Sequence, residues 1–180
     1  SMQVVIVEDE CTEAEILEKY LDKFAEENNL QISHSRFSNG KEMLEKYQFT
    51  WDLILLDIEM PLMNGIEIAR KIREKDSEVT IIFITQMAQY AIEGYSVNAL
   101  DYVLKPVNYN MFAMKMRRAV HEFHMKQTDF ILLQKKSQKY KIPLKTLCYI
   151  EVYGHTIVYH TLEQEISMTG SQTIKQIERE

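Results

Sequence analysis

Short aliphatic runs alternate with longer amphipathic segments over the first two thirds of the chain. The runs fall at residues 4–7, 53–56, 81–84 and 102–104. Apolar runs of this length, bounded by turn residues, are typical of strands buried on both faces of a parallel sheet. A more polar run at residues 31–37 predicts an edge strand. The pattern therefore predicts an α/β fold with a doubly wound, five-stranded parallel sheet.

Helices are expected between these strands, because apolar residues recur there three or four positions apart. The first helix is predicted to begin with a capping box at residues 12–15 and to end near residues 28–29. Further helices are predicted through residues 40–47, 66–74 and 89–95. Asn108 is expected to cap a long helix that runs to about Lys126.

The pattern changes after Lys126. Short strand-like runs follow at residues 130–133, 139–143, 147–151, 156–160 and 165–168. Ile174 and Ile177, at helical spacing, predict a final helix over residues 171–178, with Ser171 as its cap. We therefore expect two domains, an α/β domain at residues 2–126 and a smaller β-rich domain at residues 128–180.

Charge is spread unevenly along the chain. Residues 1–127 hold 14 Lys and Arg against 21 Asp and Glu, whereas residues 128–180 hold 7 against 6. An acidic first part is poorly suited to binding nucleic acid by itself. No apolar run approaches the ~18 residues of a membrane span, and the two cysteines, Cys11 and Cys148, are far apart in sequence. We expect a cytoplasmic protein with free thiols and no membrane partner.

Each buried strand of the α/β domain ends on polar residues that could do chemistry. Glu8 and Asp9 follow the first run, Asp57 follows the central run, and Thr85 and Lys105 follow the last two. The carboxyl ends of parallel strands meet at one edge of the sheet, where open α/β sheets bind ligands. We therefore expect these five side chains to lie together.

This combination predicts a site for a metal ion and a phosphoryl group. Three crowded carboxylates need a cation or a proton to offset their repulsion, and oxygen ligands suit Mg²⁺. The metal and the Lys105 ammonium would together stabilise a phosphoryl group. Asp57 could then act as a nucleophile that forms an acyl phosphate, while Thr85 could hydrogen-bond a phosphoryl oxygen.

From residue 4 to about residue 126, the chain resembles the response-regulator receiver of two-component signalling. The resemblance rests on residues that occur in the family's order: Glu8-Asp9, Asp57 with Pro61 and Gly65, Thr85, and Lys105-Pro106. It implies a strand order of 2-1-3-4-5, a cis Lys105–Pro106 peptide and phosphorylation of Asp57 by a sensor histidine kinase. It further implies that Mg²⁺ is bound by Asp9, Asp57 and the Glu59 carbonyl, with Glu8 acting through water.

The same resemblance assigns Tyr102 as an aromatic switch. A phosphoryl group would draw Thr85 inward, Tyr102 would turn into the space that opens, and the outer face would change. We expect this to favour a homodimer through the helix at residues 89–95, the strand at 102–104 and the helix at 108–126. No enzymatic turnover is expected beyond phosphoryl transfer to the chain itself.

The second part resembles the start of a LytTR-type DNA-binding domain. The similarity lies in Lys141-Ile142-Pro143-Leu144, Ile150-Glu151 and Gly154-His155. In that family the histidine of this loop contacts DNA, which implies the same role for His155. The family continues into further strands with a basic segment, whereas this chain stops at Glu180. We therefore expect an incomplete domain that binds DNA weakly by itself.

Two other function classes stay open at this point. The second domain could bind protein instead of DNA, which would make the chain an interaction module. The chain could also be an aspartate-nucleophile phosphohydrolase of the haloacid dehalogenase type. Those enzymes have a second Asp two residues after the nucleophile, and here Glu59 holds that position.

Overall fold

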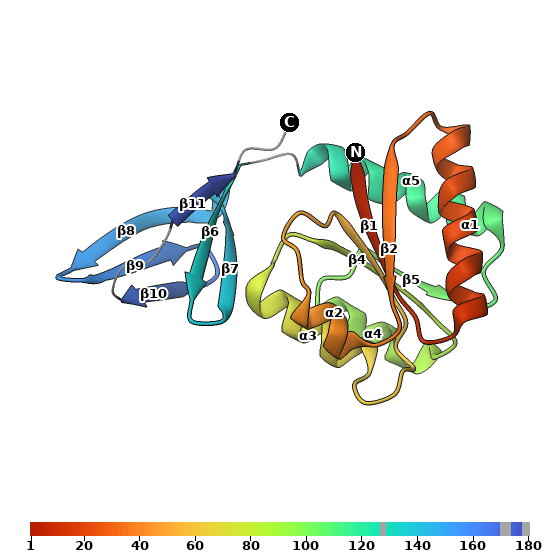
Figure 1. The fold of residues 1–180 in the computed structure, drawn as a ribbon, viewed down its shortest axis with the longest axis horizontal. Helices are drawn as coiled ribbons and strands as arrows, with labels where there is room; N and C mark the ends of the chain where they lie inside the picture. The colour runs from red at the N-terminus through yellow and green to blue at the C-terminus, as the bar shows by residue number, and fades with distance from the viewer. Residues whose placement is uncertain (127–128, 170–173, 178–180) are drawn as a thin grey trace. The chain divides into compact units, whose positions relative to one another are not determined.

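The computed structural model describes residues 1–126, 129–169 and 174–177, the last of these by backbone only (Figure 1). The chain divides into two units, each of which is described by itself. The first comprises Ser1–Arg73 and Val79–Met125, and the second comprises Glu74–Glu78 and Lys126–Glu180.

A five-stranded parallel sheet forms the centre of the first unit. Its strands lie in the order β2-β1-β3-β4-β5, which confirms the predicted fold class and strand order. All residues of β3 and β4 are buried, whereas β2, at the edge, has only partly buried and exposed positions. The bounds of the strands are β1 (Met2–Val7), β2 (Ile32–Phe37), β3 (Leu53–Leu56), β4 (Thr80–Thr85) and β5 (Asp101–Leu104).

Helices cover both faces of this sheet (Figure 1). On one face, Val4 and Ile6 of β1 pack with α1 (Cys11–Glu27) and α5 (Tyr109–Met125). On the other face, Val5 and Val7 belong to a core with α2 (Gly40–Glu45) and α3 (Gly65–Lys75). A 3-10 turn, η1 (Ala88–Tyr90), and the short helix α4 (Ala91–Ser96) complete the unit. Alternate residues of one strand thus serve two cores, because side chains of a strand point to opposite faces.

The start of α1 corrects one sequence prediction. The capping box predicted at Thr12 is wrong: α1 begins at Cys11, Glu10 is its N-cap residue, and no side chain caps it. Only residues 8–10 separate β1 from α1. Thr12 therefore already lies within the helix and cannot be the residue that caps its start. Asn108 does cap α5, as predicted, because its Oδ1 accepts a hydrogen bond from Met111 N at 2.8 Å.

Two arginines of α3 hold the short helix α4. The guanidinium of Arg73 donates hydrogen bonds to the carbonyls of Val97 (2.7 Å) and Asn98 (3.2 Å), just after α4 ends. Arg70 forms an ion pair with Glu93 at 3.1 Å. A six-residue helix is marginal by its own propensity, so these polar contacts and its packing keep it folded.

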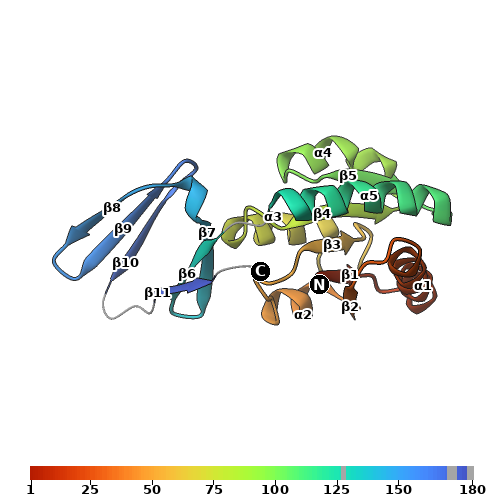
Figure 2. The ribbon, with the colours of Figure 1, turned by 90° about the horizontal axis from the view of Figure 1, so that it is seen from above.

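The second unit is rich in β-strands, as predicted. Its strands pair antiparallel in two three-stranded sheets of order β11-β6-β7 and β10-β9-β8 (Figure 2). Leu133, Tyr159 and Met168 are fully or nearly fully buried in its core. A short 3-10 turn, η2 (Leu144–Thr146), connects the two sheets. The bounds of the strands are β6 (Phe130–Lys135), β7 (Gln138–Pro143), β8 (Leu147–Tyr153), β9 (Thr156–Thr161), β10 (Glu165–Thr169) and β11 (Ile174–Ile177).

The helix predicted over residues 171–178 is wrong where the structure describes it. Residues 174–177 form β11, which pairs antiparallel with β6 from Ile174↔Leu133 to Ile177↔Phe130. Pairing with β6 decides the conformation, and such tertiary context overrides a spacing shared by only two isoleucines. The predicted cap Ser171 lies outside the described residues.

The imidazole of His160, on β9, contacts side chains of both neighbouring strands, β8 and β10. His160 Nε2 lies 2.6 Å from the carboxylate of Glu151 on β8, and its Nδ1 lies 3.1 Å from that of Glu165 on β10. The ring of Tyr149 stacks on the imidazole at a centroid distance of 4.1 Å. Cross-strand pairs of this kind stabilise a sheet that has a small core.

No helix among the residues described has the length and apolar character needed to cross a membrane.

The backbone at Gly65 closely approaches the end of β3. Gly65 N donates a hydrogen bond to the carbonyl of Ile58 at 2.9 Å. A Cβ atom added to Gly65 would lie 2.2 Å from the carbonyl oxygen of Asp57 and 2.8 Å from Cα of Ile58. Both neighbours are backbone atoms, so no side chain can rotate away. Glycine is therefore required at this position by contact with the chain around Asp57.

We predict that Gly65→Ala destabilises the first unit by about 1–3 kcal/mol, the usual cost of forcing extra atoms into a packed site. Urea unfolding followed by fluorescence of Trp51, the single tryptophan, measures this unit directly. Gly94→Ala is the matched control. Its added Cβ would meet ring atoms only at 3.7 Å or more, so it should unfold at the same or a higher urea concentration. Equal stability of Gly65→Ala and the wild type would refute the steric argument.

Candidate functional site

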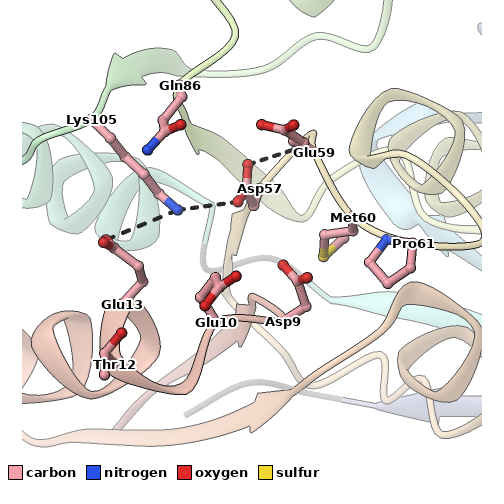
Figure 3. A pocket seen from close by; sticks show the side chains of 10 residues that line it. All are labelled: Asp9, Glu10, Thr12, Glu13, Asp57, Glu59, Met60, Pro61, Gln86 and Lys105. Atoms are coloured by element: carbon pink, nitrogen blue, oxygen red, sulfur yellow. Dashed lines mark hydrogen bonds and ion pairs between the residues drawn. The ribbon is translucent and has the colours of Figure 1, made fainter.

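A cleft of about 450 Å³ opens at the carboxyl edge of the parallel sheet (Figure 3). Loops that follow β1, β3, β4 and β5 all contribute to it. This is the edge to which the sequence assigned its polar residues. The cleft is lined by Asp9, Glu10, Thr12, Glu13, Asp57, Glu59, Met60, Pro61, Gln86 and Lys105.

Asp57 lies at the centre of this edge, one residue after β3. Its N–H donates to the carbonyl of Val7 at 3.1 Å, so the backbone still follows the sheet where the carboxylate begins. The Oδ1 atom accepts a hydrogen bond from Glu59 N at 3.2 Å, and Oδ2 lies 3.1 Å from Lys105 Nζ. Asp57 is only 6% exposed, so both oxygens have fixed surroundings.

Lys105 reaches the same carboxylate from β5. Its N–H donates to the carbonyl of Thr85 at 2.9 Å, and its peptide bond to Pro106 is cis, as predicted. The ammonium lies 2.9 Å from Glu8 Oε1 and 3.1 Å from Asp57 Oδ2, with the side chain 8% exposed. A buried ammonium is costly without partners, and here two carboxylates provide them.

Glu8, Asp9 and Asp57 form the cluster of acids that the sequence predicted. Each offers a carboxylate oxygen, and these oxygens lie within 4.8 Å of one another. Glu8 and Asp57 are buried, while Asp9 is partly exposed. An all-oxygen donor set with one side open to water fits Mg²⁺, which binds through few carboxylates and keeps several waters.

The two buried acids have different proton affinities. Burial, followed by the hydrogen bond to Asp57, raises the pKa of Glu8 to about 8. Burial also acts to raise the pKa of Asp57, but hydrogen bonds from Glu8 and Thr85 and the Lys105 ammonium outweigh it and hold this pKa below its ordinary value. Within this pair a proton is therefore held more readily by Glu8 than by Asp57. Asp57 is left ionised, the state that a nucleophile requires.

Thr85 and Tyr102 both contact the backbone of Met87 and do not line the cleft. Thr85 is fully buried at the end of β4, and its Oγ1 accepts a hydrogen bond from Met87 N at 3.2 Å. The Tyr102 hydroxyl donates to the carbonyl of the same Met87. The Tyr102 ring packs at a centroid distance of 5.9 Å from that of Phe83. The backbone of Met87, through its N–H and its carbonyl, therefore connects the Thr85 hydroxyl to Tyr102 on β5.

Other residues of the cleft were not predicted from the sequence. Glu13 on α1 lies 4.0 Å from Lys105 Nζ, and Gln86 lines the cleft beside the end of β4 (Figure 3). Glu13 belongs to the first turn of α1, so the short connection from β1 was an available signal for its position. Met87 gave no such signal, because it acts through its backbone.

His155 belongs to the second unit and is not among the residues that line this cleft. It is exposed, in the turn between β8 and β9, next to Gly154 with φ at 57°. Of the exposed side chains on β8, Tyr149, Val152 and Tyr153 are 55%, 68% and 61% accessible.

Comparison with known proteins gives a consistent result. The family model described as "Response regulator receiver domain" matches residues 4–117. The sensory transduction protein LytT of Oceanobacillus iheyensis is 29% identical over 98% of this chain and 73% of its own length. The transcriptional regulatory protein NatR of Bacillus subtilis is 30% identical over 64% of this chain. The chain spans about half, 50%, of NatR.

Solved structures resemble the first unit. The response regulator protein TrrA of Thermotoga maritima, solved in complex with Mg(2+)-BeF, has 28% sequence identity and a TM-score of 0.57. The match covers 66% of this chain and 99% of that structure.

Proposed function

This chain belongs to the response regulator receiver family, and we propose that it is a two-component regulator in which Asp57 accepts the phosphoryl group. The observation that carries the proposal is the paired environment of Asp57. Its carboxylate is ionised and buried, and it lies 3.1 Å from the Lys105 ammonium at an open cleft. A buried anion beside a fixed cation suits the transfer of a highly charged group.

Phosphoryl transfer needs little covalent chemistry from the protein. An Asp57 carboxylate oxygen attacks phosphorus of the donor, which is a phosphohistidine of a sensor histidine kinase or a small acyl phosphate. The new O–P bond replaces the P–N or P–O bond of the donor, whose electron pair leaves on the imidazole nitrogen or the carboxylate. Lys105 offsets the charge of the phosphoryl oxygens, and Thr85 donates a hydrogen bond to one of them. The chain then carries an acyl phosphate and catalyses no other turnover.

We propose that Asp9, Asp57 and the carbonyl of Glu59 hold Mg²⁺, with Glu8 acting through water. The crowding of three carboxylate oxygens within 4.8 Å supports this assignment. Bound Mg²⁺ would supply positive charge beside the phosphoryl oxygens.

The second unit is proposed to link phosphorylation to transcription. Its exposed His155 stands on a turn that could enter a groove of DNA, and NatR is named as a transcriptional regulatory protein. The proposed signal passes from Thr85 through the backbone of Met87 to Tyr102, and from there to the outer face of α4, β5 and α5. Exposed Ile92 (81%) and Tyr95 (82%) on this face suit a homodimer contact.

The first prediction concerns the acceptor. Incubation with acetyl phosphate and Mg²⁺ should add one phosphoryl mass to the chain, and Asp57→Asn should abolish the adduct because the amide is not a nucleophile. Intact-mass spectrometry measures both. Asp52→Asn, at the opposite end of β3, is the matched control and should be phosphorylated normally. An adduct on Asp57→Asn would exclude Asp57 as the single acceptor.

The second prediction concerns the metal. Asp9→Asn removes one anionic ligand and should weaken Mg²⁺ binding at least about tenfold, a loss of ~1.4 kcal/mol. Isothermal titration calorimetry measures the dissociation constant directly. Glu15→Gln, an exposed change on α1, controls for net charge and should leave it unaltered. Unchanged affinity in Asp9→Asn would remove Asp9 from the ligand set.

The third prediction concerns assembly. Light scattering with Mg²⁺ and beryllofluoride, a phosphoryl mimic, should show a shift from monomer toward dimer at matched protein concentration. Tyr95→Glu should prevent the shift, because it buries a charge in the contact. Leu62→Glu, at an equally exposed position (90%) after β3, should dimerise like the wild type. Identical masses with and without the mimic would contradict the proposed dimer.

A further inference from the structure

We infer that Tyr20 is a positioning residue for Lys105, acting through the carbonyl of Val107; the functional part of this inference rests on the proposed role of Asp57. Tyr20 lies on α1 and is not among the residues that line the cleft. Its hydroxyl donates a hydrogen bond to the Val107 carbonyl at 3.1 Å. Val107 is two residues after Lys105, in the segment that joins β5 to α5.

Besides the Lys105 ion pairs and the packing of Val107 against the core, three hydrogen-bonded contacts hold that segment, residues 105–108. Lys105 N–H donates to the carbonyl of Thr85 at 2.9 Å at its start. Asn108 caps α5 at its end. Between Lys105 and Asn108, the hydrogen bond from the Tyr20 hydroxyl holds the carbonyl of Val107. Since Val107 has no strand partner, this contact is a fixed reference for the backbone just beyond the lysine.

The Tyr20 side chain is itself firmly placed. Its ring lies 5.4 Å from that of Phe112 and 5.5 Å from that of Tyr109, both on α5, and it packs against the core on this face of the sheet. Ring packing leaves the phenolic oxygen little freedom, so it can define where Val107 lies. The Tyr109 hydroxyl instead donates to the exposed Glu27, which does not belong to the segment.

α1 approaches the lysine segment at a second point. Glu13, seven residues before Tyr20 and thus on the same side of the helix, lies 4.0 Å from Lys105 Nζ. One helix therefore touches both the head of Lys105 and the backbone that carries it. The cleft also begins where α1 starts, at Asp9 and Glu10. Tyr20 thereby fixes the position of Lys105 relative to α1, the helix that follows Glu8 and Asp9.

Accurate placement matters because Lys105 must meet two partners at once. Its Nζ lies 2.9 Å from Glu8 and 3.1 Å from Asp57, at the end of a flexible four-carbon chain. A shift of about 1 Å in a group that orients a reaction can reduce its rate by about 100-fold. Losing one backbone contact should move the lysine less than this, so a smaller effect is expected.

The test is Tyr20→Phe, which removes the hydroxyl and keeps the ring. The maximal rate of phosphorylation by acetyl phosphate at saturating Mg²⁺ should fall roughly three- to tenfold, with the half-saturating acetyl phosphate concentration little changed. Tyr109→Phe removes a neighbouring hydroxyl and should react like the wild type. In a Lys105→Met background, adding Tyr20→Phe should slow the reaction no further, because the group that it positions is gone. The inference would be overturned if Tyr20→Phe slowed phosphorylation equally with Lys105 and with Met at that position. It would also be overturned if Tyr20→Phe alone did not slow the reaction.

A second measurement does not depend on phosphorylation. Competitive labelling with acetic anhydride, read by mass spectrometry, reports how well each lysine is protected. Tyr20→Phe should raise the labelling of Lys105 at least about twofold relative to the exposed Lys46, whereas Tyr109→Phe should not. Unchanged labelling of Lys105 would refute the positioning role. A wild-type chain that accepts no phosphate would refute the role of Asp57 instead, while the labelling would still decide whether Tyr20 holds Lys105.

Discussion

A buried ammonium between two buried carboxylates is the interaction on which the rest of this structure depends. Glu8, Asp57 and Lys105 each directly follow a different strand, and burying any one of them without the others would be costly. One positive charge serves two acids, and their pKa values shift in opposite directions, upward for Glu8 and downward for Asp57. The sheet supplies the geometry, because parallel strands bring their carboxyl ends to one edge.

Most of this site could be predicted because its residues follow directly after buried strands. Aliphatic runs locate the strands, and the polar residue after each run must then lie at the common edge. Asp57 and Lys105 were found in this way, and the structure places them 3.1 Å apart. The roles of Glu59 and His155 came from family resemblance alone, and the structure supplies only their positions.

The features that sequence reasoning missed depend on contacts between distant segments. Met87 contributes its backbone, which any residue could provide, and Tyr20 reaches Val107 across 87 positions. The helix predicted over residues 171–178 failed for the same reason, since β11 exists through its pairing with β6. The cap at Thr12 failed because the connection after β1 is shorter than the pattern indicated. The spacing of apolar and polar residues along the chain does not reveal the contacts of Met87 and Tyr20, the pairing of β11 or the start of α1.

The close approach of Gly65 to the end of β3 has a consequence for how the protein can change over evolution. The Gly65 amide and the Ile58 carbonyl close the loop of residues 59–64 at its base, independently of its tip. The side chain of Leu62 in that loop is 90% exposed, so it contributes little to the packing of the fold. The tip can therefore accept new side chains with little disturbance of Asp57. Related proteins could therefore differ in the side chains at the tip of this loop, and so in the proteins they bind, while the site around Asp57 stays the same.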